Sequence, residues 1–192
     1  MAKVGVEQVS ASVADWSREK PQRLWDPSRR LIQAIRNYQK ASRSSGLLRG
    51  FRQRWWKNVH RFWSVVTQCE INLDADIGGG FLMPHPNGIV IHPDSRIGPN
   101  CMIFQQVTLA AGETGSPRLG GHVDIGAGAK ILGDVTIGDH AAIGANAVVL
   151  TDVPAYHTAV GIPARILPPR KDRVKTRAVS YTHLTLPTNY SV

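Results

Sequence analysis

The sequence predicts a mainly β fold, a parallel β-helix of about five 18-residue coils that follows a short helical segment. An aliphatic residue recurs at every sixth position over most of the stretch from Ile71 to Val149. A strand buries every second residue and an α-helix every third or fourth, so a period of six fits neither. Three such hexads close one triangular turn, and stacked turns bury the aliphatic side chains along a common axis. The period is unbroken in two runs, Ile91, Ile97, Ile103, Leu109 and then Leu119, Ile125, Ile131, Ile137, Ile143, Val149.

Two insertions interrupt this period, and they mark the places where loops leave the coil. Two extra residues lie between Met83 and Ile91, and four lie between Leu109 and Leu119. Without them, the stretch from Ile71 to Ile166 contains five turns. Glycine often follows the aliphatic residue, as at Gly98 and Gly126. We expect these glycines to adopt the positive φ that tight corners demand.

The charge of the chain is concentrated at its N-terminal end. The 192 residues carry a net charge of +9, and residues 1–69 hold 14 Lys and Arg against four Asp and Glu. Such a segment can meet phosphates, but its charges lie among large apolar residues and no nucleic-acid-binding motif accompanies them. We therefore expect no nucleic acid as a partner.

Nothing in the hydropathy of the sequence indicates a membrane protein. No apolar run approaches the roughly 20 residues that cross a bilayer, and the first ten residues, MAKVGVEQVS, lack the apolar stretch of a signal peptide. We expect a cytoplasmic protein without a membrane partner. The two cysteines, Cys69 and Cys101, are too few for a disulfide framework, and we expect reduced thiols.

Residues 1–69 are predicted to form a basic α-helical segment. Asp26 and Pro27 are typical of an N-cap and a first helical residue, and Gly46 separates this helix from a second one that runs from about Leu47 to Val66. We expect the apolar face of the second helix to pack on the first helix and cap the first coil; the alternative is a surface for the association of trimers or partners. The apolar residues are Leu31, Ile32, Ile35 and Tyr38 in the first helix and Leu48, Phe51, Trp55, Val59, Phe62 and Val66 in the second.

The repeat ends after Ile166. We assign residues 70–166 to the β-helix domain and residues 167–192 to a disordered tail of prolines and charged residues. Within the tail, residues 180–192 show no repeat, cap or amphipathic pattern. They resemble translated sequencing-adapter sequence, so we treat them as non-native and assign them no function.

The hexads, the insertion MPHPNG and the run IGAGAKILGDVTIGDHAAIGANAVVLTDVPAYHTAVGIPARI resemble the left-handed β-helix acyltransferases, and among them the serine O-acetyltransferases. The resemblance covers residues 69–166, about half of the chain. The left-handed sense follows from the resemblance alone, because parallel crossovers are otherwise right-handed in about 98% of cases. The resemblance further implies a homotrimer, with a dimer of trimers as an alternative, active sites in grooves between neighbouring coils, and direct acetyl transfer from acetyl-CoA.

The resemblance assigns the catalytic base to His85. In serine acetyltransferases the base is the His of an Asp-His-(Gly/Ala)-Thr-Gly loop, and this loop reads Pro-His-Pro-Asn-Gly at residues 84–88. An imidazole with a pKa near ~6.5 suits the removal of a hydroxyl proton at neutral pH. The family places a carboxylate fifteen residues earlier to orient the ring, and Glu70 stands there instead of the usual Asp. The alternative is that neither residue is catalytic, in which case His85 is a polar residue of the inserted loop and Glu70 is a charged surface residue.

The resemblance also places the acetyl-CoA site. Its matching positions are Ala111, Ala127, Gly128 and Ala145, with Arg165 near the nucleotide end. The fold itself demands small residues at corners, so these positions have a structural explanation as well. The remaining histidines show no metal-site spacing, and we expect no metal.

The acceptor site departs from the family pattern. The family's acidic residues before and after the catalytic His are replaced by Pro84 and Pro93, and the loop AAGETGSP is four residues shorter and lacks the family's Arg-His pair. A zwitterionic acceptor requires a carboxylate for its ammonium group and an Arg for its carboxylate. Glu113 and Arg118 within the short loop are the candidates to supply them.

Three functions remain open on the sequence. The first is a serine O-acetyltransferase with a rebuilt acceptor site, which would feed cysteine synthesis. The second is an O-acetyltransferase for a sugar or polysaccharide precursor, which needs the same base without the zwitterion clamp. The third is a non-catalytic hexapeptide-repeat scaffold, which has no need of a His in an inserted loop.

Overall fold

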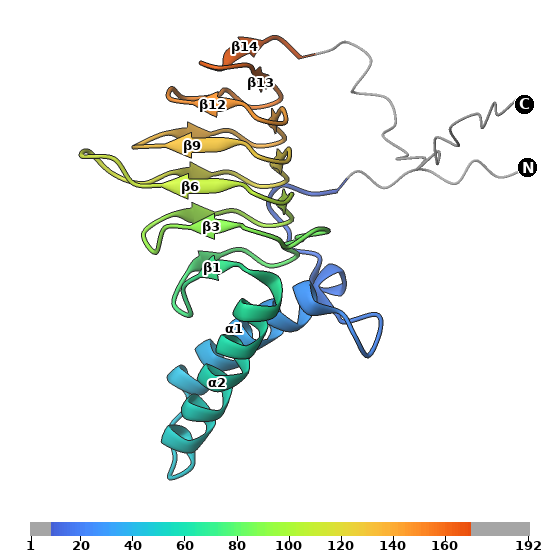
Figure 1. Cartoon of the computed structure of the whole chain (residues 1–192), viewed down its shortest axis with the longest axis vertical. Helices are drawn as coiled ribbons and strands as arrows, with labels where there is room; N and C mark the ends of the chain where they lie inside the picture. The colour runs from blue at the N-terminus through green and yellow to red at the C-terminus, as the bar shows by residue number, and fades with distance from the viewer. Residues whose placement is uncertain (1–8, 170–192) are drawn as a thin grey trace, which may run out of the picture. The chain divides into compact units, whose positions relative to one another are not determined.

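The computed structural model describes residues 9–169 of the chain. In this part a helical hairpin precedes a coil of short strands (Figure 1). A 3₁₀-helix, η1 (Trp16–Glu19), comes first, followed by α1 (Pro27–Arg43) and α2 (Arg49–Thr67). Both predicted helices are therefore present within a few residues of their expected bounds. The predicted tail falls almost entirely outside the described residues.

The coil is built from three sheets, one for each side of the triangle. Sheet A has the order β1-β3-β6-β9-β12, sheet B the order β10-β7-β4-β2, and sheet C the order β14-β13-β11-β8-β5. All neighbouring strands are parallel except β13 and β14. The strands are β1 (Glu70–Ile71), β2 (Asp76–Ile77), β3 (Val90–Ile91), β4 (Arg96–Ile97), β5 (Met102–Ile103), β6 (Thr108–Ala110), β7 (Arg118–Leu119), β8 (Asp124–Ile125), β9 (Lys130–Leu132), β10 (Thr136–Ile137), β11 (Ala142–Ile143), β12 (Val148–Val149), β13 (Thr158–Val160) and β14 (Arg165–Leu167).

The strand register confirms the hexad reading and both insertions. In sheet A, Ile71 pairs with Ile91 and Leu109 pairs with Ile131, so the two lengthened turns hold 20 and 22 residues instead of 18. The extra residues lie in the loops 83–89 and 111–117, as predicted. The mainly β parallel β-helix is confirmed, and the arrangement agrees with the left-handed class.

The number of coils is about four, not five. Four turns lead from β1 to β12, and the next turn does not return to sheet A. After the turn at residues 161–164 the chain reverses, and β14 pairs antiparallel with β13. Ile166 is therefore 39% exposed rather than buried on the axis. The final hexad ends the coil instead of extending it.

The core consists of the aliphatic residues predicted from the period. Ile103, Leu109, Ile125, Ile131 and Ile137 are completely buried. The small residues that complete the hexads, Ser95, Cys101, Ala129, Ala141 and Ala147, are buried as well. Both cysteines are free thiols, and burial raises the pKa of Cys101 to about 12.

The glycines that follow the aliphatic residues have a different role from the one predicted. The positive-φ positions of the coil lie elsewhere, many of them at Asn, Gln, His or Tyr residues, and do not include Gly98 or Gly126. A Cβ atom at Gly98 would lie 2.4 Å from the carbonyl oxygen of Gly120, and one at Gly126 would lie 2.6 Å from the amide nitrogen of Ala145. These positions require glycine because successive coils approach closely there, not because of their φ.

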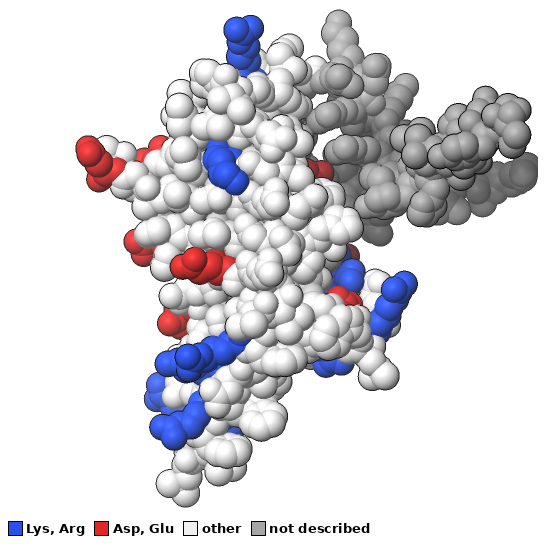
Figure 2. All heavy atoms as spheres, in the orientation of Figure 1, with Lys and Arg blue, Asp and Glu red and all other residues white. Residues whose placement is uncertain are grey.

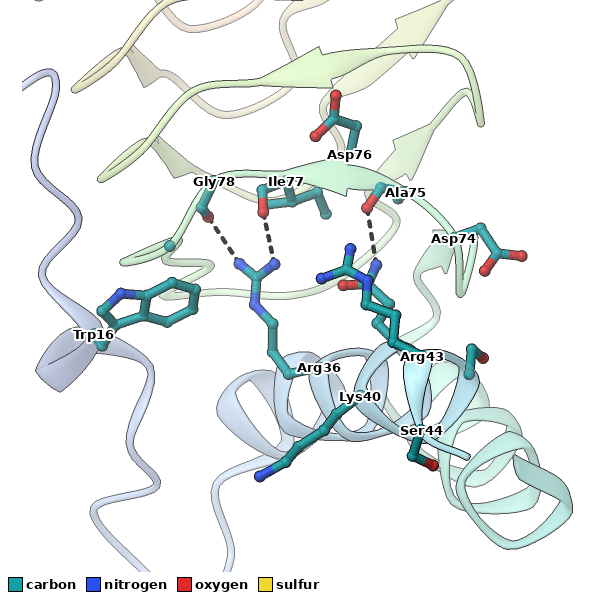
Figure 3. A pocket seen from close by; sticks show the side chains of 13 residues that line it. Trp16, Arg36, Lys40, Arg43, Ser44, Asp74, Ala75, Asp76, Ile77 and Gly78 are labelled. Carbon is teal, nitrogen blue, oxygen red and sulfur yellow. Dashed lines mark hydrogen bonds between the residues drawn. The ribbon is translucent and has the colours of Figure 1, made fainter. Parts of the chain in front are cut away.

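The helix α1 docks on the first coil through hydrogen bonds to free carbonyl groups (Figure 3). Arg36 donates to the carbonyls of Ile77 and Gly78 at 2.6 and 2.7 Å and is paired with Glu19 at 2.8 Å. Gln39 donates to the carbonyls of Leu73 and Ala75, both at 3.1 Å. These contacts satisfy backbone acceptors at the open end of the coil. The cap is thus provided by α1, whereas we expected it from the second helix.

The helix α2 departs from the prediction. Its only buried residue is Thr67, and the expected core face is largely exposed to solvent. The hairpin packs instead through the opposite side of α2, where Trp63 contacts the core and His60 is hydrogen bonded to the carbonyl of Ile71 at 2.9 Å. An amphipathic pattern shows that a helix has an apolar face, but not which partner covers it.

Candidate functional site

His85 lies in an ordered loop at the corner between sheet C and sheet A, and its side chain is exposed. The loop is fixed on both sides. The carbonyl of Asn87 accepts from the amide of Gln106 at 2.7 Å, and the carbonyl of Pro86 accepts from the thiol of Cys69 at 3.1 Å. Gly88, with a φ of 64°, allows the chain to turn back into sheet A. The inserted residues therefore present an imidazole from a rigid support.

Glu70 begins β1 directly beside this loop. Its amide donates to the carbonyl of Ile89 at 2.8 Å, and its residue pair in the sheet is Val90. The described residues show no hydrogen bond between the Glu70 carboxylate and the His85 ring. Glu70 and His85, fifteen residues apart, therefore lie at the same corner, but their side chains are not hydrogen bonded to each other in this structure.

The same corner continues through the coils above His85, and we call this column the His85 corner. It consists of residues 84–88, 104–106, 126–128, 144–146 and 161–164. Backbone hydrogen bonds connect the levels. Gly128 donates to the carbonyl of Gln105 and Asn146 donates to the carbonyl of Ala127, both at 2.8 Å. The ring of Phe104 is 6.2 Å from that of His85, directly above the loop.

Three of the predicted binding residues fall on this corner, and a fourth adjoins it. Ala127 and Ala145 occupy equivalent places in consecutive coils, Gly128 follows Ala127, and Arg165 begins β14 directly after the last turn of the column. Ala145 and Arg165 are exposed, and Ala127 and Gly128 are half-buried. With such short side chains, backbone groups are accessible along the column, and an extended ligand can approach them closely.

The other predicted residues lie at the opposite end of sheet A. Ala111 and Glu113 belong to the loop between β6 and β7, and Arg118 is the first residue of β7, at the corner between sheets A and B. Glu113 is exposed, whereas the guanidinium of Arg118 forms a salt bridge with Asp134. Within one chain, these residues and His85 are separated by the width of a sheet.

One contact beside this loop was not predicted from the sequence. The Nδ1 atom of His92 lies 3.3 Å from the hydroxyl oxygen of Ser116 and accepts from the amide of Asp94 at 3.3 Å. His92 and Ser116 are 24 positions apart in the sequence, and the inserted loop brings them together.

Two further histidines meet at the third corner, between sheets B and C. The Nδ1 atoms of His122 and His140 are 2.8 Å apart, and the His140 ring stacks on Tyr156 with ring centres 4.8 Å apart. Across residues 9–169, no group of three or more potential ligands is arranged to hold a metal ion.

A hollow of about 790 Å³ lies between α1 and the first coil, bordered by Trp16, Arg36 and residues 74–79 (Figure 3). None of the candidate residues borders it. Its Arg36 is engaged with Glu19 and two backbone carbonyls. The chemistry of the exposed His85 loop makes that loop the better candidate site.

Comparison with known proteins relates this geometry to an enzyme family. Residues 116–151 match the family model of the bacterial transferase hexapeptide (six repeats). A serine acetyltransferase of Synechocystis sp. is 45% identical over 130 residues, which are 65% of this chain and 50% of that protein. A serine acetyltransferase of Staphylococcus xylosus is 43% identical over 135 residues, 67% of this chain and 59% of that one.

A solved structure of a serine acetyltransferase in complex with CoA is similar to the structure of this chain. It has a TM-score of 0.62 and 38% sequence identity, and the match covers 75% of this chain and 58% of that one. The chain spans about half the length of the curated relatives it matches. The described coil thus carries the hexapeptide repeat of bacterial transferases, and the chain is similar to serine acetyltransferases.

Proposed function

We propose that the protein is an acetyl-CoA-dependent O-acetyltransferase whose acceptor is L-serine. It would act in the cytoplasm and supply O-acetylserine for cysteine synthesis. The observation that carries the proposal is the His85 corner, where an exposed imidazole lies below Phe104 and the small residues Ala127, Gly128 and Ala145 follow in the next two coils. The similarity to serine acetyltransferases supports the acceptor and the acyl donor.

The His85 imidazole would act as the general base. It takes the proton of the acceptor hydroxyl as the hydroxyl oxygen attacks the thioester carbonyl carbon. The resulting tetrahedral intermediate collapses, the carbon–sulfur bond breaks, and the imidazolium returns its proton to the CoA thiolate. Such acid–base assistance contributes roughly 10²–10⁴ in rate. Glu70, beside the loop, would stabilise the imidazolium once the ring turns toward it.

The small residues of the His85 corner would hold the pantetheine arm of acetyl-CoA. The Gly128 amide and the Ala127 carbonyl are engaged between coils, so the other backbone groups at Ala127, Gly128 and Ala145 would exchange hydrogen bonds with the amides of the arm. Arg165 at the end of the column offers a cation for the phosphates of the nucleotide. Ala111 lies at the other corner and would contact the arm from a second copy of the chain.

A homotrimer, with or without pairing into hexamers, would complete the site. Within one chain, the base and the acceptor loop lie at opposite ends of sheet A. Between two copies, the His85 corner of one chain can face the loop of the next. This arrangement would allow Glu113 and Arg118 to meet the acceptor held at His85.

A sugar hydroxyl is the second candidate acceptor, and one observation favours it. Arg118, the proposed partner for a serine carboxylate, is already paired with Asp134. A neutral sugar does not require this arginine, whereas serine would have to compete with Asp134 for it.

The test is acetyl-CoA consumption, measured by thiol release, for the wild type, His85→Ala and the control His157→Gln. His157 is a half-buried coil residue outside the His85 corner. We expect His85→Ala to lower kcat by 10²–10⁴ and His157→Gln to retain activity. Equal rates for His85→Ala and the wild type would disprove the role of the base, and no release with any acceptor would favour a scaffold.

The acceptor is tested by comparing L-serine with a panel of sugars and nucleotide sugars. If Glu113 and Arg118 bind serine, alanine at either position raises the KM for serine without changing the KM for acetyl-CoA. Release with sugars alone would assign the chain to polysaccharide modification.

A further inference from the structure

The face of α2 that we expected to be buried is an exposed apolar surface. We define the α2 apolar face as Leu48, Phe51, Trp55, Phe62, Val65 and Val66. Phe51 is 70% exposed, Trp55 57% and Phe62 55%. The opposite side of α2 carries the contacts with the coil through His60 and Trp63. Within the face, Phe62 also touches the edge of the Trp63 ring, with ring centres 5.0 Å apart.

The surroundings of this face are strongly basic. Residues 27–67 contain ten Lys and Arg and no Asp or Glu. Arg29 and Arg36 are paired with acidic residues that precede the hairpin, Asp26 and Glu19. Figure 2 shows Lys and Arg gathered over the hairpin, while Asp and Glu appear mainly over the coil.

Basic side chains also border the apolar face itself. Helical geometry places Arg54 one turn from Phe51 and Arg61 one turn from Val65. The 19-residue helix is about 28 Å long, so apolar and cationic groups run side by side along its length. The partner must therefore offer both an apolar phase and negative charge.

We propose that the α2 apolar face docks on the surface of an anionic lipid bilayer. Trp and Phe on one face with Arg and Lys beside them are the composition of helices that lie in the bilayer interface. Anionic headgroups attract the basic border, and the acyl boundary covers the aromatic rings. The helix would lie on the membrane and not cross it, since no helix within residues 9–169 is long and apolar enough to span a bilayer.

Other occupants fit less well. A second copy docked on the same face would bring two hairpins of high positive charge together, which costs free energy through like-charge repulsion. Nucleic acid would match the charge but would not cover the aliphatic and aromatic side chains. The proposal is independent of the proposed catalytic function, because α2 contains none of the candidate site residues.

The test is co-sedimentation of the full chain with vesicles of equal parts phosphatidylglycerol and phosphatidylcholine, and with phosphatidylcholine alone. We expect binding to the anionic vesicles, weaker binding at high salt, and little binding to the neutral ones. The double variant Phe51→Gln/Phe62→Gln should lose affinity at least about tenfold, because two aromatic side chains no longer enter the acyl boundary. The control Leu150→Gln, which removes an exposed apolar residue of the coil, should bind like the wild type.

Three results would overturn the proposal. The first is equal binding to anionic and neutral vesicles, or none. The second is a Phe51→Gln/Phe62→Gln variant that binds like the wild type. The third is a smaller sedimentation coefficient for that variant without lipid, which would make the face an interface between copies. Circular dichroism confirms that each variant is folded, and acetyl-CoA consumption is measured separately.

Discussion

Substitution of Gly98 by alanine should destabilise the coil strongly. A Cβ atom at this position would lie 2.4 Å from the carbonyl oxygen and 2.5 Å from the carbonyl carbon of Gly120, where ordinary contact begins at 3.4 Å. Both atoms belong to the backbone of the next coil, so no side chain can move aside. The two coils must separate by about 1 Å, which strains the hydrogen bond from the Gly98 amide to the carbonyl of Leu119.

This separation should cost about 3 kcal/mol, at the upper end of the overpacking range. For a chain of this size, the melting temperature should fall by roughly 6–12 °C. The assay is thermal unfolding by circular dichroism at one fixed chain concentration, since any oligomer makes the melting temperature depend on concentration. The matched control is Gly50→Ala in α2, where the added methyl group meets nothing within 4 Å. We expect that variant to be stabilised by up to about 1 kcal/mol. A Gly98→Ala protein that melts within about 2 °C of the wild type would refute the close stacking of coils.

Two further predictions concern the docking of the hairpin on the coil. Arg36→Met should lower the free energy of unfolding in urea by about 3 kcal/mol, because the Glu19 carboxylate, 8% exposed, loses its partner. Adding Glu19→Gln should recover part of this loss. Equal stabilities of the single and the double variant would contradict the pairing. Burial lowers the pKa of His60 below its ordinary 6.5, so its contribution to stability is complete above pH 6.5 and decreases as the pH falls through the folded pKa. The urea midpoint of the wild type should therefore fall more between about pH 7.5 and 5.5 than that of His60→Gln, and parallel decreases would contradict a buried neutral His60.

The repeat could be predicted because its signal is local. The six-residue period is visible in the sequence at positions such as Ile103, Ile125 and Ile131, and each of these side chains is buried as the period predicts. The role of Gly98 could not be predicted in the same way. The sequence shows that a small residue is required, but the backbone that approaches it lies 22 residues away.

The candidate site was predicted only in part. The position of His85 in an inserted loop follows from counting hexads, and the structure places Ala127, Gly128 and Ala145 on the same corner. The contact of His92 with Ser116 depends on how the second insertion folds, for which the period gives no information. The exposure of the α2 apolar face depends on how the hairpin docks, which its amphipathic pattern does not specify.

The central claim is that the protein transfers an acetyl group directly from acetyl-CoA to a hydroxyl group, with His85 as the general base. The most direct measurement is a stoichiometric assay of the wild-type protein, in which CoA thiol release and O-acetylated product are quantified together with L-serine or a sugar as acceptor. We expect equal amounts of the two, and at least about a hundredfold less product from His85→Ala in the same time. CoA release without an acetylated product, or an undiminished yield from His85→Ala, would contradict it.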